Sequence, residues 1–581
     1  MEKADRLDNI RHTLAHILAA AVGEIYKFDK VKLTLGPAID NGFYYDIDFG
    51  GEKVADTDLK KIEDRMRKIL PKWNEWEYKE MSKDEALRFF GNNEYKKELI
   101  NEIKEKIMVY TCGEFTDLCR GGHVKNPSKE IAPDSFKLDR VAGAYWRGDE
   151  KNKMLTRIYG LAFDTKEELD TYITQREEAK KRDHKKIGKD LDLFTFSDLV
   201  GGGLPLWTPK GTWLRDILDS FVWELRKKHG YQKVDIPHIT RKELYEKSGH
   251  WQKFSAELFK IETREKHLFV MKPMNCPHHT QIYSRKPWSY RELPQRYAST
   301  TKVYRDEQSG ELSGLSRVRA ITQDDAHVFC RQNQAKEEMA KIWEIIEEFY
   351  GATGFKLYHR LSLHDPAKME KYLGTAEVWQ KSENELRDLV KERGVSVIEA
   401  VGEAAFYGPK IDFMAKDSLG REWQVATIQL DMNMPERFDL VCTNEKGSQE
   451  RIVMLHCAIM GSIERYLSIL IEHFAGAFPL WLSPVQVKVI PVREKHNEYA
   501  KEIFEMLKEN NIRAELDDKD ENLGSKVRDT KNNKIPYWIV IGDKEEEAKK
   551  ITLESRDHGQ LGQIPKEELL KKLLEEIKNK K

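Results

Sequence analysis

The segment from residue 301 to residue 329 brings together residue types that bind phosphate. It begins TKVYRDE, passes through a loop with Gly310 and Gly314, and ends VRAITQDDAHVF. Glycine takes the positive φ of tight turns, so the segment predicts two antiparallel strands joined by a loop. Guanidinium groups bind phosphate oxygens in a bidentate manner, which makes Arg305 and Arg319 candidate ligands. A surface hairpin crossed by salt bridges is the alternative, and these residues alone leave both open.

The second strand of this predicted hairpin carries three polar residues at every other position. These are Gln323, Asp325 and His327. Successive side chains of a strand point to opposite faces, so all three are expected on one face. An amide, a carboxylate and an imidazole on one strand face are typical of a pocket wall.

A second cluster is predicted near the N-terminus. His12 and His16 lie four residues apart in a helical pattern, and Cys119 and His123 have the same spacing in CRGGHV. Three interpretations stay open: a hydrolytic pocket without metal, a zinc site, and a polar core cluster. Neighbours expected to join this pocket are Lys96, Asp117 and Arg120.

A helix near residue 465 carries one basic residue among apolar neighbours. The sequence reads GSIERYLSILIEHF, and Arg465 is expected to be buried. A buried guanidinium is costly unless it meets a fixed anion, so Arg465 is a candidate phosphate ligand, with a structural ion pair as the alternative.

Length and composition define the broad class. With 581 residues the chain exceeds a single core, and 98 basic against 99 acidic residues do not indicate a polyanionic partner. There is no apolar run of about 18 residues, no signal-peptide pattern and no regular cysteine spacing. We therefore expect a cytoplasmic α/β multidomain protein that is not membrane-bound.

Several short motifs together carry a family resemblance. In order along the chain they are HTLAH, CRGGH, MKPMNCPHH, YRDEQSGELSGLSRVRAITQDDAH, AFYGPKIDF and GSIERY. With these motifs the chain resembles the threonyl-tRNA synthetases, a family of class II aminoacyl-tRNA synthetases, over essentially its whole length. The implied fold is a class II antiparallel sheet with flanking helices, an α+β editing domain and an α/β anticodon-binding domain. The implied order is editing domain (1–163), linker helix (164–190), catalytic domain (191–484) and anticodon-binding domain (485–581).

The resemblance implies an ATP-binding site around the hairpin. Arg305 would hold the α-phosphate and Arg465 the γ-phosphate, with Mg²⁺ accompanying ATP. Glu307 and Arg319 would engage the adenine and the triphosphate tail. The resemblance also implies roles in catalysis for Lys410 and in ATP binding for Gln424.

The resemblance implies one zinc ion per subunit, held by Cys276, His327 and His456. Three protein ligands leave one position open, which in the family recognises the amino group and hydroxyl of threonine. Valine lacks that hydroxyl and is rejected. The residues expected around the substrate threonine are Gln323, Asp325, Tyr407 and Gln429.

Serine keeps the hydroxyl and lacks only a methyl group, which is worth about 1 kcal/mol. This is the argument usually made for synthetases that edit, and it implies that the first domain hydrolyses mischarged Ser-tRNA(Thr). Its pocket would work through a positioned water without metal. The implied editing residues are His12, His16, Lys96, Asp117, Cys119, Arg120 and His123.

Further features of the resemblance concern partners and departures. The partners would be tRNA(Thr), ATP and threonine, with a homodimer formed through Pro237 and the preceding helix. The chain is expected to lack the ubiquitin-like domain that precedes the editing domain in many members. Gly122 stands where bacterial relatives often have proline, which puts editing efficiency in question. Glu545 and Arg556 are the weakly supported anticodon-reading candidates.

Three other functions stay under consideration. A synthetase for another amino acid is disfavoured by the Cys276, His327 and His456 set. A tRNA-binding regulator without activation chemistry is disfavoured by the retained arginines. A metallohydrolase centred on His12 and His16 would leave the large C-terminal part unexplained.

Overall fold

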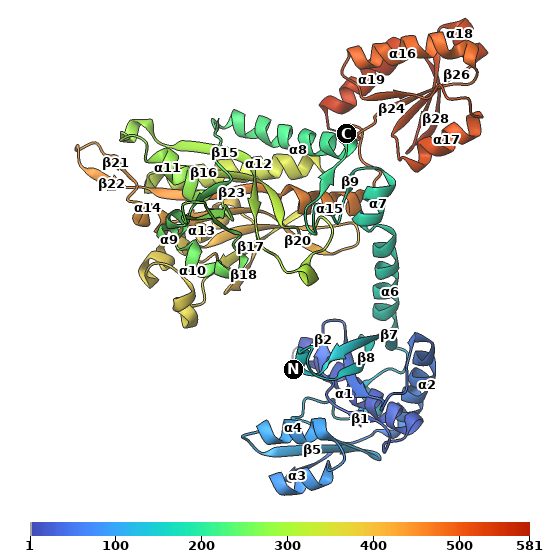
Figure 1. The fold of residues 1–581 in the computed structure, drawn as a ribbon. Helices are drawn as coiled ribbons and strands as arrows, with labels where there is room; N and C mark the ends of the chain where they lie inside the picture. Colours follow the sequence, from blue (N-terminus) through green and yellow to red (C-terminus); the bar gives the residue numbers. More distant parts are fainter. Residues whose placement is uncertain (1–2, 581) are drawn as a thin grey trace. The chain divides into compact units, whose positions relative to one another are not determined.

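The computed structural model describes residues 3–580 (Figure 1). The chain divides into two compact units, Met1–Glu178 and Ala179–Lys581, so the boundary falls inside helix α6 (Lys166–Lys181). No helix among the described residues has both the length and the apolar character that a membrane span requires.

The first unit is built on a long N-terminal helix and an antiparallel sheet. Helix α1 (Lys3–Tyr26) buries an apolar stripe against strand β3 (Gly42–Asp48). The sheet has the order β1-β3-β8-β7, and β2 also pairs with β3. The other strands are β1 (Lys32–Leu33), β2 (Ala38–Ile39), β7 (Phe136–Tyr145) and β8 (Met154–Ala162). Helix α2 (Leu59–Ile69) packs on α1 and completes this core.

A smaller sheet of three antiparallel strands forms the rest of this unit. It contains β4 (Glu77–Met81), β5 (Ile107–Cys112) and β6 (Phe115–Leu118). Helices α3 (Lys83–Phe89) and α4 (Glu94–Glu102) lie between β4 and β5 in the chain. Ser82 and Asn93 cap their N-termini by accepting backbone N–H groups. This is the α+β architecture expected for the first part of the chain.

The segment predicted as one linker helix forms two helices. After α6, helix α7 (His184–Asp190) begins with Asp183 as its N-cap, whose carboxylate accepts the Lys185 N–H. A capping residue has non-helical φ and ψ, so the chain turns here instead of continuing one helix.

The large central sheet has eight strands in the order β11-β15-β16-β23-β20-β19-β17-β18. Only β11–β15 and β17–β18 are parallel pairs. The strands are β11 (Gln232–Lys233), β15 (Gln295–Tyr304), β16 (Ala320–Cys330), β17 (Leu357–Leu363), β18 (Val397–Val401), β19 (Lys410–Lys416), β20 (Glu422–Asp431) and β23 (Val453–Ser462). Helices α8 (Pro209–Lys228), α12 (Ala335–Ala352), α13 (Ala376–Arg393) and α15 (Ile463–Phe474) contribute buried side chains to its largest apolar core. This is the expected antiparallel sheet with flanking helices.

The C-terminal part, expected to be an α/β domain, has a mixed sheet. Strands β25 (Ala514–Leu516), β24 (Val487–Pro491) and β26 (Tyr537–Ile541) are parallel neighbours. Strands β27 (Ile551–Ser555) and β28 (Gly559–Ile564), which the sequence analysis did not anticipate, add an antiparallel hairpin at one edge. Helices α16 (Asn497–Glu509), α17 (Leu523–Asn532), α18 (Asp543–Ala548) and α19 (Lys566–Lys578) complete it.

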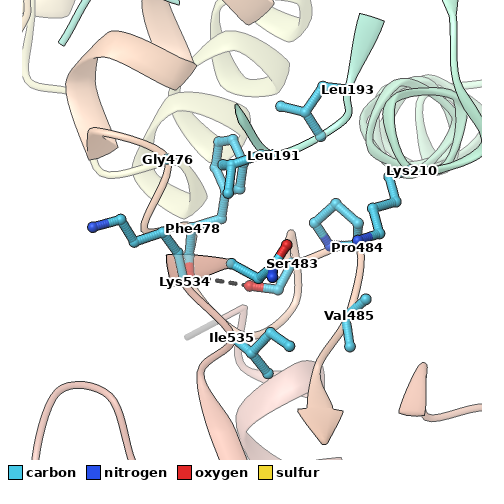
Figure 2. A pocket seen from close by; sticks show the side chains of 11 residues that line it. Leu191, Leu193, Lys210, Gly476, Phe478, Ser483, Pro484, Val485, Lys534 and Ile535 are labelled. Carbon is cyan, nitrogen blue, oxygen red and sulfur yellow. Dashed lines mark hydrogen bonds between the residues drawn. The ribbon is translucent and has the colours of Figure 1, made fainter. Parts of the chain in front are cut away.

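This part joins the central sheet through the segment 475–486. Figure 2 shows a small cavity there, between Leu191 and Leu193 on one side and Ile535 on the other. Ser483 Oγ donates to the Phe478 carbonyl at 3.1 Å and fixes the turn. Lys210, which also lines this cavity, pairs with Glu515 of β25.

Candidate active sites

Strands β15 and β16 form the antiparallel hairpin predicted from residues 301–329. Thr301 lies opposite Gln323, and Tyr297 lies opposite His327. Asp325 and His327 share one face, as their alternation predicted, and Asp325 Oδ1 lies 3.7 Å from His327 Nε2. Asp324, which immediately precedes Asp325, points to the other face and accepts the backbone N–H groups of Ile459 and Met460.

The sheet register brings distant parts of the chain to the same face. His327 on β16 lies opposite His456 on β23, which lies opposite Gln429 on β20 and then Lys410 on β19. Directly opposed residues share a face, so one row holds both histidines, the amide and the ammonium group.

Cys276, His327 and His456 come together beside this row. Cys276 begins helix α11 (Cys276–Tyr283), and a ligand atom from each residue lies within 4.8 Å of the others. His327 Nε2 and His456 Nδ1 are 3.1 Å apart. All three side chains are buried, and burial lowers the pKa of His327 and raises that of Cys276. Neutral imidazole and thiol or thiolate groups this close are the donor set that zinc prefers.

Outer contacts orient these three side chains. His279 Nδ1 lies 2.8 Å from His327 Nδ1, and Asp431 Oδ2 lies 3.0 Å from His456 Nε2. The ring nitrogens of His327 and His456 that face each other are thereby directed toward Cys276. His250 Nε2 lies 3.8 Å from the Cys276 sulfur. The sequence analysis missed His250, His279 and Asp431; only the position of His279 within CPHH gave a signal.

The residues predicted to surround threonine lie beside the same cluster. Asp325 Oδ2 accepts a hydrogen bond from Asn275 Nδ2 at 3.0 Å. The Tyr407 hydroxyl donates to Gln429 Oε1 at 2.6 Å, and its ring stacks on His456. Gln323 is half-buried on the same face of β16 as Asp325.

The predicted phosphate ligands lie at the end of the sheet where β15 and β23 finish and β16 begins. Arg305 follows β15 and is half-buried, and its guanidinium lies 3.6 Å from the Met274 sulfur. The expectation that Arg465 is buried is wrong. Arg465 is exposed because it lies in the first turn of α15, on the side away from the core. No carboxylate is paired with either arginine within residues 3–580, and the Arg465 guanidinium lies 5.8 Å from the Trp423 ring.

The other predicted ATP ligands already have partners. Glu307 is buried and accepts both Nε and a terminal nitrogen of Arg317 at 2.7 Å. Arg319 donates to the Glu307 carbonyl at 3.0 Å and to the Gly202 carbonyl at 3.1 Å. The Arg317–Glu307 ion pair and the Arg319 hydrogen bonds therefore hold the loop between β15 and β16 in place.

Lys410 and Gln424 converge on one buried carboxylate. Asp412 Oδ2 accepts Lys410 Nζ at 2.6 Å, and its Oδ1 accepts Gln424 Nε2 at 2.7 Å. Arg360 also donates to Asp412, at 3.2 Å. Asp412, which the sequence analysis did not single out, organises this part of the face.

The first unit holds the second predicted site, a cavity of about 680 Å³. Cys119 Sγ lies 3.0 Å from His12 Nε2 and 3.4 Å from His123 Nε2. His16 Nδ1 lies 3.4 Å from Asp117 Oδ2. The cavity lining includes six of the seven predicted editing residues, namely His12, His16, Lys96, Asp117, Cys119 and Arg120. His123 closes the cluster and stacks on Trp76, which the sequence analysis missed.

Groups of opposite charge lie next to each other within this cavity. Burial alone would raise the pKa of Cys119, but hydrogen bonds from His12, His123 and His16 outweigh it and lower the pKa to about 3. Burial would lower the pKa of His16, but the neighbouring Asp117 and Cys119 raise it to about 9. Asp117 also pairs with Lys96 at 2.5 Å, and both are buried. Near neutral pH the cavity thus holds a thiolate, an imidazolium, a carboxylate and an ammonium group.

The loop after Cys119 has an unusual backbone. Gly121 and Gly122 take φ of 93° and 87°. Proline fixes φ near −65°, so the proline that the family resemblance suggested for this position does not fit the conformation of Gly122.

Comparisons with known proteins agree with these geometries. Residues 259–474 match the family described as tRNA synthetase class II core domain (G, H, P, S and T). Residues 107–159 match the Threonyl and Alanyl tRNA synthetase second additional domain, and residues 486–576 match the Anticodon binding domain. A threonine–tRNA ligase of Flavobacterium johnsoniae is 49% identical over 95% of this chain and 85% of that protein.

The chain belongs to the threonyl-tRNA synthetase family. A further relative, a threonine–tRNA ligase of Deinococcus radiodurans, is 47% identical over 98% of this chain and 89% of its own. A solved structure of the RNA binding domain of threonyl-tRNA synthetase from Cryptosporidium parvum has a TM-score of 0.65 at 36% identity. It covers 68% of this chain and 98% of its own. The expected family and fold class are thereby confirmed.

The two weak anticodon candidates both have partners inside the C-terminal part. Glu545 accepts Thr552 Oγ1 at 2.7 Å and Gln563 Nε2 at 2.9 Å. Arg556 pairs with Asp557 and donates to the Lys534 carbonyl at 2.8 Å. Contact of Glu545 or Arg556 with a base therefore stays a prediction.

Proposed function

We infer that the protein is a threonine–tRNA ligase with an editing activity. It joins threonine and ATP into threonyl-adenylate with release of pyrophosphate, and it then acylates the terminal ribose of tRNA(Thr). The observation that carries this conclusion is the placement of a Cys-His-His cluster and of two arginines that have no carboxylate partner within residues 3–580, in a chain 49% identical to a threonine–tRNA ligase.

Activation would depend on positioning and charge. Arg305 and Arg465 are two guanidinium groups at this end of the sheet that no carboxylate neutralises within the described residues. We assign the α-phosphate to Arg305 and the γ-phosphate to Arg465, with Mg²⁺ bound to ATP. Fixed cations that meet developing negative charge lower the barrier without reorganisation. Arg319, Glu307, Gln424 and Lys410 would support this site through the contacts described above.

Cys276, His327 and His456 fit a zinc ion. Burial lowers the pKa of His327, and the outer nitrogens of both histidines already have partners, so their inner nitrogens are available as ligands. Zinc bound there would act as a Lewis acid toward the amino group and hydroxyl of threonine. One ion per subunit is proposed.

Selection of threonine would follow from the residues around this cluster. Asp325 shares a face with His327 and would receive the substrate's ammonium group, with Gln323, Tyr407 and Gln429 beside it. A site that requires a hydroxyl rejects valine strongly, because its own polar groups would stay unpaired.

Removal of serine would take place in the first unit. The Asp117 carboxylate and the Cys119 thiolate offer negative charge to the ammonium of a seryl group. His12, His16 and His123 surround the space where a water would be positioned. Lys96 and Arg120 would contact the RNA or the ester. This assignment needs no metal.

We propose four functional parts with the boundaries 1–163, 164–190, 191–484 and 485–581. The partner implied by the synthetase and anticodon-binding parts is tRNA. A homodimer through Pro237 and helix α8 is also proposed.

Pyrophosphate exchange with threonine, valine and serine tests the central assignment. Exchange should be strong with threonine, weaker with serine and negligible with valine. Threonine-independent exchange, or none, would contradict it. His12→Ala should leave threonine exchange unchanged while Ser-tRNA(Thr) accumulates, which separates the two sites.

A further inference from the structure

A buried histidine of the linker contacts the synthetic site. His184, the first residue of α7, is 3% exposed. Its Nδ1 lies 2.7 Å from Glu472 Oε1, and its backbone N–H donates to the same oxygen at 3.2 Å. Glu472 belongs to helix α15, and Arg465 lies in the first turn of the same helix. The linker is therefore attached to the helix that carries a proposed phosphate ligand.

The other ring nitrogen contacts the loop between β15 and β16. The Leu315 backbone N–H donates to His184 Nε2 at 3.0 Å. A donor at Nε2 requires a lone pair there, so Nδ1 carries the proton and donates to Glu472. Both nitrogens of one neutral imidazole are thus used, one on α15 and one on the loop.

Asp183, His184 and Glu472 also resemble a metal site by composition. The contacts argue against that use. The lone pair at Nε2 is taken by an N–H group, and Nδ1 faces Glu472 as a donor. Neither ring nitrogen is available to a cation.

The loop fits closely around this imidazole. Gly314 has φ of 52°, and a Cβ added there would lie 2.3 Å from His184 Nε2. Two residues later, Ser316 Oγ lies 2.9 Å from Ser468 Oγ on α15. From there the loop leads directly to Arg317, which holds Glu307, and to Arg319.

We propose that His184 is a positioning residue of the synthetic site: it fixes the loop that carries Arg319 against the helix that carries Arg465 before ATP binds. The proposal rests on the proposed ATP-binding roles of these arginines. It also makes the linker part of the activation machinery, because α7 follows α6 directly.

Two substitutions separate the contacts of the imidazole. His184→Asn keeps a donor near the Nδ1 position and loses the acceptor for Leu315. His184→Gln keeps an acceptor near the Nε2 position and loses the donor for Glu472. The matched control is Lys189→Ala, because Lys189 is an exposed residue of the same helix. Each variant is assayed as full-length enzyme by pyrophosphate exchange at varied ATP and by amide hydrogen exchange of residues 306–318 without ATP.

We expect His184→Asn to raise the KM for ATP about tenfold, because a tenfold change corresponds to the loss of one buried hydrogen bond. Amides around Leu315 should exchange at least tenfold faster in the same variant. His184→Gln should stay within about threefold of wild type in both measurements, and Lys189→Ala should change neither. A purely structural role would lower the Tm of both His184 variants equally and leave the KM for ATP unchanged.

Gly314→Ala provides a second approach, with Gly310→Ala as control because open space surrounds Gly310. Part of the Gly314→Ala effect comes from its positive φ, so it is measured in wild-type and His184→Ala backgrounds. The rise in KM should be at least threefold smaller in the His184→Ala background. Equal rises in both would overturn the proposed contact.

The outcomes distinguish the proposal from the assignment on which it rests. If Arg465→Ala and Arg305→Ala leave exchange kinetics intact, the assigned phosphate roles fail, whatever the His184 variants do. If those roles hold and His184→Asn accelerates loop exchange without raising the KM for ATP, the positioning proposal is overturned. Unchanged loop exchange in His184→Asn also overturns it.

Discussion

Cys119 should react with iodoacetamide at a rate that hardly depends on pH between 5 and 8. His12, His123 and His16 lower its pKa to about 3 against the opposing effect of burial. A group with that pKa is more than about 98% ionised at pH 5, so its thiolate fraction cannot rise further. Cys119 is half-buried and the other five cysteines are buried, which makes the labelling selective in the folded protein.

An ordinary thiol gives a very different profile. With a pKa of about 8.5, its thiolate fraction rises from about 0.0003 at pH 5 to about 0.24 at pH 8, roughly 800-fold. Absolute rates are less informative, because a low pKa also weakens the nucleophile. With a Brønsted coefficient of about 0.4–0.5, a shift of about 5.5 pKa units from that ordinary thiol slows each thiolate by roughly 160- to 560-fold. The slope with pH is therefore the quantity to compare.

Labelling is followed by mass spectrometry of the peptide that contains Cys119. The same protein unfolded in urea is the control and should show the steep profile of a free thiol. A native rate that rises with the same steep slope would refute the thiolate and the charge arrangement of the editing cavity.

Three further outcomes follow from particular contacts. Asp431→Asn weakens the acceptor for His456 Nε2 and should lower zinc affinity about 10- to 100-fold, measured by chelator competition, with unchanged affinity contradicting the role of Asp431. Arg465→Ala should lower kcat/KM for ATP in pyrophosphate exchange about 100-fold or more, with Arg465→Lys intermediate; a change below threefold would contradict its assignment. Lys96→Met leaves the Asp117 carboxylate buried without its ammonium partner and should destabilise the first unit by about 3–5 kcal/mol in urea unfolding, while a loss below 1 kcal/mol would show that the ion pair is dispensable.

The alternation along β16 was predictable because strand geometry depends only on sequence spacing. Asp325 and His327 therefore fell on one face as expected. The exposure of Arg465 was not predictable, because an apolar sequence does not show which side of a helix's first turn faces the core. The surrounding residues of α15 are buried, and Arg465 alone projects outward.

Residues that reach the site from distant parts of the chain gave little signal in the sequence. Asp431 and His250 reach the Cys276 cluster from the end of β20 and from a short helix, and no local pattern relates them to it. Strand β28 also gave little signal, because it is largely exposed and lacks apolar alternation. Strand β27 does alternate, with Ile551 and Leu553 buried, so its short pattern was present in the sequence and was missed. Long-range contacts such as those of Asp431 and His250 are not encoded in short windows of sequence.

The most direct test of the zinc and threonine assignment combines metal analysis with amino-acid-dependent pyrophosphate exchange on the wild type and on Cys276→Ala. Wild-type protein should contain one zinc per chain and exchange with threonine but not with valine. Cys276→Ala should lose zinc and exchange together. Zinc retained at full occupancy in Cys276→Ala, or threonine exchange that persists without zinc, would contradict the account.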